Sequence, residues 1–164
     1  MIISSKDIAV NLLKCLVTFY AVYFAVGSLV YASFRQANFD GKIPFDFEAW
    51  IYLSECCSVY KDKDLVNVIS MEVTYFICGV IFGILVRSRV WDYAITVTVI
   101  HILVSCLVML AFPMNWSWWV CLGCGLTVLI LVGEAVGFAR RKKSLTKVNP
   151  EPSQTNTSYL YRKG

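Results

Sequence analysis

The chain carries little charge for its length. Of its 164 residues only 16% are Asp, Glu, Lys or Arg, whereas a soluble domain has about 25%. Its net charge of +4 comes from basic residues that flank apolar blocks and form no stripe, so the sequence does not predict a nucleic-acid-binding surface. Apolar residues reach 58%, against about 45–50% in soluble domains, and this balance favours a membrane protein.

Several signatures of catalysis and of metal binding are also missing. The sequence contains no glycine-rich phosphate loop, no HExxH and no GxSxG. A single histidine, His101, leaves no polyhistidine metal site. We therefore expect no enzyme activity, no cofactor and no bound metal.

Four apolar blocks predict the fold class. Each is long enough to cross the hydrocarbon core, which takes about 20 apolar residues in a helix. Only helices and closed barrels satisfy their backbone in lipid, and these blocks lack the alternation of barrel strands. The sequence predicts an all-α, four-helix transmembrane bundle in residues 1–139, with spans at about 8–34, 65–86, 93–112 and 117–139. Residues 35–64 form a loop, and 140–164 are predicted to be a disordered cytosolic tail.

Basic residues near the span ends predict the orientation. Ten Lys and Arg lie in the termini and the 87–92 turn, against four in the 35–64 loop. The positive-inside rule then places both termini in the cytosol and the 35–64 loop in the lumen. Aromatic side chains gather where belts at the two membrane interfaces are expected: Trp91 on the cytosolic side, and Trp116, Trp118 and Trp119 on the other.

Three ionisable residues, Glu72, His101 and Glu134, fall inside the unbroken apolar parts of the predicted spans; in the first span this part begins at Cys15. An unpaired charge is costly there. Counted from the cytosolic span ends, His101 lies about 12 Å deep and Glu134 about 8 Å deep. We therefore predict a hydrogen bond between them that clamps two helices, whereas Glu72 lies too far along its helix. A proton path or ligand site would use the same residues, so a small transporter or channel is an alternative.

Cysteines offer a second alternative function. Cys121-x-x-Cys124 lies near the lumenal start of the fourth span, and Cys56-Cys57 lies in the lumenal loop. This layout resembles that of vitamin-K-epoxide-reductase-like enzymes, which are four-helix membrane thiol oxidoreductases. Two adjacent loop cysteines do not easily act as a separated relay pair, so we do not favour this function. The sequence does not give the redox state of either pair.

Two further patterns concern packing. Gly79-xxx-Gly83 and Gly133-xxx-Gly137 permit close helix approach, either within the bundle or in a homo-oligomer. The segment PFDFEAWIYL, residues 44–53, is predicted to lie along the lumenal interface with Phe45, Phe47 and Trp50 as anchors.

From residue 65 onward the sequence resembles the SYS family of four-span Golgi trafficking proteins. The resemblance lies in WDYAITVTVIH at 91–101, FP at 112–113, WW at 118–119 and GE at 133–134. Stretches at 72–79, 90–95 and 108–113 are closer still to one member of that family. The family pattern falls here on Asp92, Thr96, His101, Pro113, Trp118, Trp119 and Glu134.

The resemblance implies a Golgi or trans-Golgi membrane protein that recruits an Arf-related small GTPase and catalyses no reaction. Arg87, Arg89 and Asp92 are the candidate surface for that cytosolic partner. Alternatively, Asp92 serves only as a cap of the third helix. The 35–64 loop and the tail do not match the trafficking members, so the retention of GTPase recruitment stays open.

Overall fold

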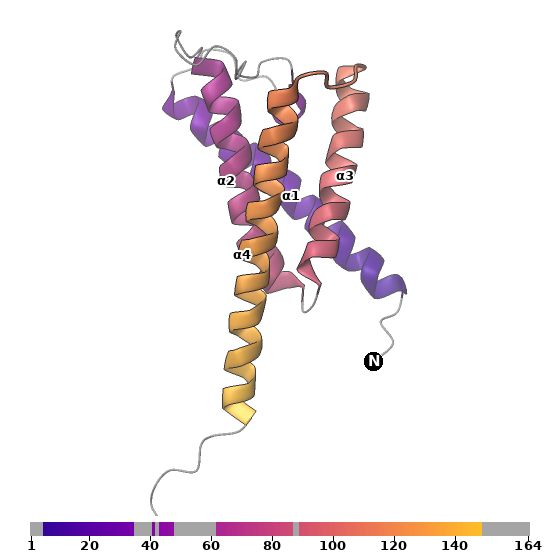
Figure 1. The fold of residues 1–164 in the computed structure, drawn as a ribbon, viewed down its shortest axis with the longest axis vertical. Helices are drawn as coiled ribbons and strands as arrows, with labels where there is room; N and C mark the ends of the chain where they lie inside the picture. Colours follow the sequence, from indigo (N-terminus) through magenta and orange to yellow (C-terminus); the bar gives the residue numbers. More distant parts are fainter. Residues whose placement is uncertain (1–4, 35–40, 42, 48–61, 87–88, 149–164) are drawn as a thin grey trace, which may run out of the picture.

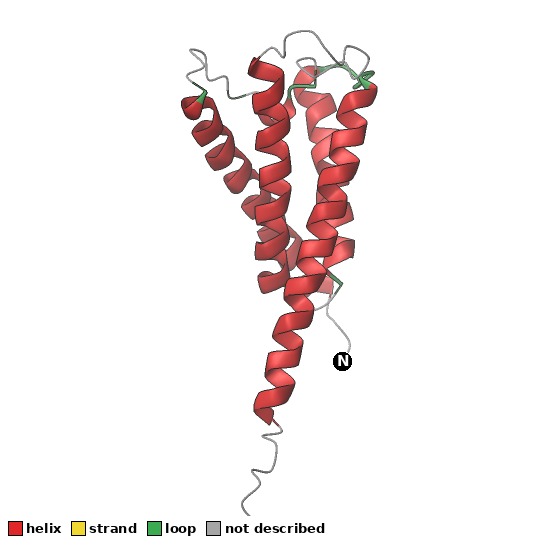
Figure 2. Cartoon of the chain, turned by 60° about the vertical axis from the view of Figure 1, so that its left-hand side comes forward, coloured by secondary structure: helices red, strands yellow, loops and turns green. Residues whose placement is uncertain are grey.

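The structure, a computed structural model, describes residues 5–34, 41, 43–47, 62–86 and 89–148. Within these residues it contains helices and no strand, as Figure 2 shows. The elements in chain order are α1 (Ser5–Ser33), the short 3-10 helix η1 (Ile43–Phe45), α2 (Asp62–Leu85), α3 (Val90–Met109) and α4 (Trp116–Val148). Four helices are long and apolar enough to cross a membrane, so the predicted all-α, four-span fold class is confirmed.

The C-terminal end of α4 differs from the sequence prediction. The helix continues to Val148, nine residues beyond the predicted span, so the start of the predicted tail is helical. Residues 140–148 contain no Gly or Pro, and basic side chains favour the last turns of a helix. The extension adds about 13 Å of helix, and Figure 1 shows it projecting past the other helices. Residues 149–164 lie outside the described residues.

Glycines bring α2 and α4 together. A Cβ added to Gly79 would lie 3.0 Å from the Leu129 carbonyl oxygen, and one on Gly83 would lie 2.6 Å from the carbonyl oxygen of Gly133. These distances leave no room for a side chain, so the first small-residue pair packs within the chain. Gly137 differs, since a Cβ there would meet only Arg141 of its own helix.

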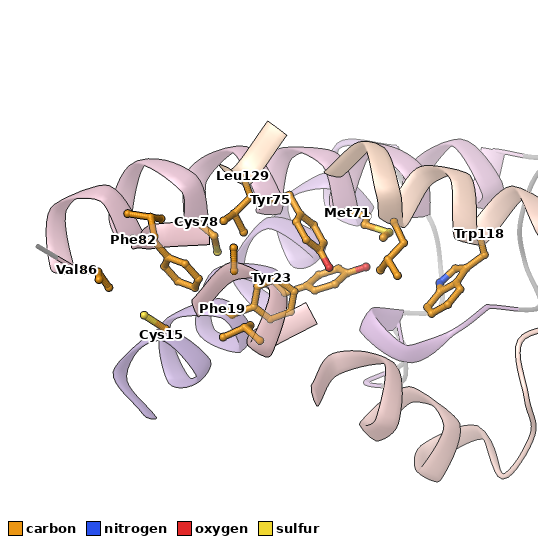
Figure 3. Close-up of a cluster of buried hydrophobic side chains, with 14 of the residues drawn as sticks. Cys15, Phe19, Tyr23, Met71, Tyr75, Cys78, Phe82, Val86, Trp118 and Leu129 are labelled. Carbon is orange, nitrogen blue, oxygen red and sulfur yellow. The ribbon is translucent and has the colours of Figure 1, made fainter. Parts of the chain in front are cut away.

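Buried aromatic side chains fill the centre of the bundle (Figure 3). Phe19 and Tyr23 of α1 and Tyr75 and Phe82 of α2 are all nearly inaccessible. The outward faces carry large apolar side chains as well: Leu29 is 69% exposed, Leu107 72% and Leu131 65%. Apolar side chains on both the inside and the outside are what a lipid environment requires.

The two ends of the bundle differ in content. The start of α1, the end of α2, the start of α3 and the α4 extension lie at one end of the bundle (Figure 1). The end of α1, the start of α2 and the α3–α4 connection lie at the other. α1 crosses the other helices obliquely, whereas α2 and α4 run side by side. We call the end with the start of α1 the turn end and the other end the loop end. That the turn end faces the cytosol stays a prediction.

Candidate functional site

At the turn end, Glu134 of α4 caps α3. Its Oε1 atom accepts a hydrogen bond of 3.1 Å from the backbone N–H of Val90, the first residue of α3. The N-cap residue itself, Arg89, has φ 58 and ψ 50 and makes no side-chain cap hydrogen bond. The first turn of a helix has unpaired N–H groups and a partial positive charge. The carboxylate from α4 therefore supplies the cap that the local sequence lacks.

Two arginines of α4 complete the contact with the α2–α3 turn. Arg140 donates a hydrogen bond from Nη1 to the carbonyl oxygen of Ile84, in the last turn of α2. The Arg141 guanidinium lies 3.6 Å from Oε2 of Glu134. A cation at the C-terminus of α2 and a carboxylate at the N-terminus of α3 both interact favourably with the helix dipoles. α4 thus holds both sides of the turn; we call these three contacts the turn clamp.

The predicted hydrogen bond between His101 and Glu134 is not formed. Glu134 lies level with Val90, and His101 is eleven residues further along α3, or about 16 Å. The prediction counted depth from the expected span ends at 93 and 139. Because α4 does not end there, the two counts did not start from the same level.

Arg89 and Asp92 present their side chains at the same end. Both are exposed, and neither side chain makes a hydrogen bond or ion pair with the described residues. Asp92 uses only its backbone, accepting a hydrogen bond from the Thr96 hydroxyl at 2.8 Å. Its predicted role as a helix cap is not observed, because Glu134 occupies that position. Arg87 lies outside the described residues.

His101 lies in a box of aromatic rings between α1 and α3. It is 1% exposed. Its ring centroid lies 5.3 Å from Phe19, 6.0 Å from Tyr20 and 5.8 Å from Tyr23, all on α1, and 6.1 Å from Phe45 of η1. The Nδ1 atom of His101 has no hydrogen-bond partner in the described part of the chain.

The segment 44–47 enters the bundle instead of lying along the interface as predicted. Phe45 packs against Tyr20 with ring centroids 5.8 Å apart, and Phe47 is 4% exposed against Trp118. These rings therefore pack against side chains of α1, α3 and α4 at the loop end. Trp50 lies outside the described residues.

The four tryptophans of the predicted belts fall into two groups, exposed rings and rings that pack within the protein. Trp91 is 48% exposed and Trp116 77%, as lipid-interface anchors should be. Trp118 differs, because it is buried and packs edge-on against Trp119 with centroids 5.1 Å apart. Trp119 donates from Nε1 to the Pro113 carbonyl oxygen at 3.0 Å and so fixes the α3–α4 turn.

The remaining titratable candidates are not members of the turn clamp or of the aromatic box. Glu72 is half-buried on α2, and Cys121 and Cys124 are free thiols on α4, the first half-buried and the second exposed. Cys56 and Cys57 lie outside the described residues. In the described ranges no three His, Cys, Asp or Glu side chains are grouped as a metal site would require.

Comparison with known proteins gives two matches. A family model described as SYS1, "Integral membrane protein S linking to the trans Golgi network", matches residues 4–148, which include all four spanning helices. The human protein named putative transmembrane protein 244 is 38% identical over 122 residues, covering 73% of this chain and 88% of that protein. No solved structure matches the chain. The resemblance seen in the sequence is confirmed.

Proposed function

This chain belongs to the SYS1 family of integral membrane proteins, and from that premise we propose that it recruits an Arf-related small GTPase to the trans-Golgi membrane. The proposed role is binding without catalysis. The observation that carries it is the turn clamp beside Arg89 and Asp92, whose side chains are exposed and have no hydrogen-bond or ion-pair partner among the described residues.

Rigid placement matters for such a surface. A binding group that is already ordered loses less conformational entropy when its partner docks. Charges at the rim of an interface mainly set the association rate and the choice of partner. Arg89 and Asp92 carry opposite charges one helical turn apart, so they suit a partner surface with the complementary pair.

The charge of the turn end supports its assignment to the cytosol. The α4 extension carries Arg140, Arg141, Lys142 and Lys143 in succession, all exposed. Basic residues next to a span end favour the cytosolic side. A cytosolic GTPase would therefore reach the end of the molecule that carries the turn clamp.

Proximity labelling from a C-terminally tagged copy in cells, with microscopy against a trans-Golgi marker, tests the proposal. We expect co-localisation with the marker and an Arf-related GTPase among the labelled proteins. The double variant Arg89→Glu, Asp92→Lys should reduce GTPase labelling by about tenfold, equivalent to about 1.4 kcal/mol, without changing location. The matched control is Lys6→Glu, Asp7→Lys, which makes the same exchange of exposed charges in the first turn of α1.

Two results would contradict the proposal. Location in the endoplasmic reticulum with no GTPase labelled would reject the function itself. Equal loss of labelling in both double variants would instead reject the surface, because a general charge effect would then explain the loss.

A further inference from the structure

Three rings from three different elements meet in the aromatic box. The centroids of Tyr20 (α1) and Phe45 (η1) lie 5.8 Å apart, those of Tyr20 and His101 (α3) 6.0 Å, and those of Phe45 and His101 6.1 Å. They therefore form a nearly equilateral triangle. Two of its corners carry polar atoms, the Tyr20 hydroxyl and Nδ1 of His101, and both atoms are buried without a hydrogen-bond partner among the described residues.

Such a pair of orphan atoms is costly inside a membrane protein. A buried polar group without a hydrogen bond costs about 1–3 kcal/mol, and lipid offers no compensation. The neighbouring rings Phe19 and Phe45 are apolar and cannot satisfy either atom. A phenol hydroxyl both donates and accepts, and a neutral imidazole Nδ1 does one or the other. A partner that can both donate and accept satisfies the two atoms whichever tautomer the imidazole adopts.

We propose that the Tyr20 hydroxyl and Nδ1 of His101 together bind one water molecule between α1 and α3, within the aromatic box. Water donates and accepts at once, so it satisfies both atoms with either tautomer of His101. Buried waters typically occupy positions where polar atoms lack protein partners. In the described residues no hydrogen bond between side chains joins α1 to α3, so this water would form their polar link.

The chain allows a direct test because His101 is its only histidine. The full chain, labelled with ¹⁵N-histidine and placed in lipid nanodiscs, should give the signals of a single imidazole. We expect magnetisation transfer from water to that imidazole. Tyr20→Phe should reduce the transfer several-fold, because one of the two hydrogen bonds that hold the water is lost.

Tyr23→Phe is the matched control. The Tyr23 ring lies 5.8 Å from His101 and loses the same hydroxyl, but this hydroxyl is not one of the orphan atoms. It should leave the transfer unchanged. The absence of transfer in the wild type, an equal loss in both variants, or a Nδ1 signal showing a direct bond to Tyr20 would each overturn the proposal.

Discussion

At the scale of single residues, Glu134 shows how a carboxylate is kept within a membrane protein. Its side chain is 36% exposed, which keeps part of its solvation. One oxygen accepts from Val90, and the other lies near the Arg141 guanidinium. These two contacts offset part of the cost of burying a carboxylate, which is unfavourable when the group has no partner.

Replacement of Glu134 tests its role as a cap. Glu134→Leu should lower the free energy of unfolding by about 1–2 kcal/mol, the usual cost of a lost cap. Glu134→Gln keeps an acceptor oxygen for Val90 and should lose less than half of that amount. Amide hydrogen exchange in the first turn of α3 is the measurement. If Glu134→Leu instead accelerated amide exchange around His101 and left Val90 unaffected, Glu134 would pair with His101, as the sequence predicted.

Trp118 and Trp116 provide a second residue-scale prediction. Trp118→Ala should cost about 3–5 kcal/mol of stability, because it leaves a cavity beside Phe47. Trp116→Ala, two residues earlier on the same helix, removes a ring that is 77% exposed and should cost under about 1 kcal/mol. Unfolding in mixed detergent measures both. Similar losses in the two variants would show that Trp118 is not part of the core.

The sequence identified the residues that need partners more readily than the partners themselves. Glu134 and His101 were found because ionisable groups in a span require an explanation. Their contacts depend on how far one helix slides past its neighbour, and residues 140–148 contain no Gly or Pro that would stop the α4 helix where its apolar run ends. A tryptophan likewise fits a belt or a core, and for Trp118 the choice depended on the placement of Phe47.

At the scale of elements, the four long helices followed directly from apolar runs of membrane length. The extension of α4 and the entry of residues 43–47 into the bundle did not. Outside the membrane, helix length depends on local propensity and on Pro150, which hydropathy does not report. The segment 43–47 is placed by the contacts of Phe45 with Tyr20 and of Phe47 with Trp118, which no local sequence pattern indicates.

The contact between α2 and α4 gives an element-scale prediction with an internal control. A methyl group at Gly83 would meet the Gly133 carbonyl oxygen at 2.6 Å and Val136 Cβ at 2.8 Å. Gly83→Ala should therefore force the helices apart and cost about 1–3 kcal/mol. Gly123→Ala meets nothing within 4 Å and should leave stability unchanged or raise it by up to about 1 kcal/mol.

Steric-trap or detergent unfolding measures the stability of the two glycine variants, and crosslinking measures their oligomeric state. Equal stability would mean that α2 and α4 do not approach as closely as the structure shows. If Gly83→Ala instead changed only the amount of crosslinked dimer, the small-residue pair would act between chains.

At the scale of the whole molecule, the two ends of the bundle have different chemistry. The turn end carries the turn clamp and, beside it, the exposed charges of Arg89 and Asp92. The loop end has buried rings from Phe45, Phe47 and Trp118 that close the core. A binding surface on the turn end can therefore change its charges without disturbing the packing that stabilises the fold.

The distribution of basic residues also predicts how the whole molecule is oriented in the membrane. Ten basic residues belong to the termini and the α2–α3 turn against four in the 35–64 loop, so the turn end should face the cytosol. Tags at either terminus should bind antibody once the plasma membrane alone is permeabilised. A tag inserted after Met114, which is 88% exposed in the α3–α4 turn, should bind only after internal membranes are opened. The reverse pattern would place Arg89 and Asp92 in the lumen, beyond the reach of any cytosolic GTPase. If the tag at one terminus were accessible and the tag at the other protected, the number of spans would be odd, which contradicts four spans.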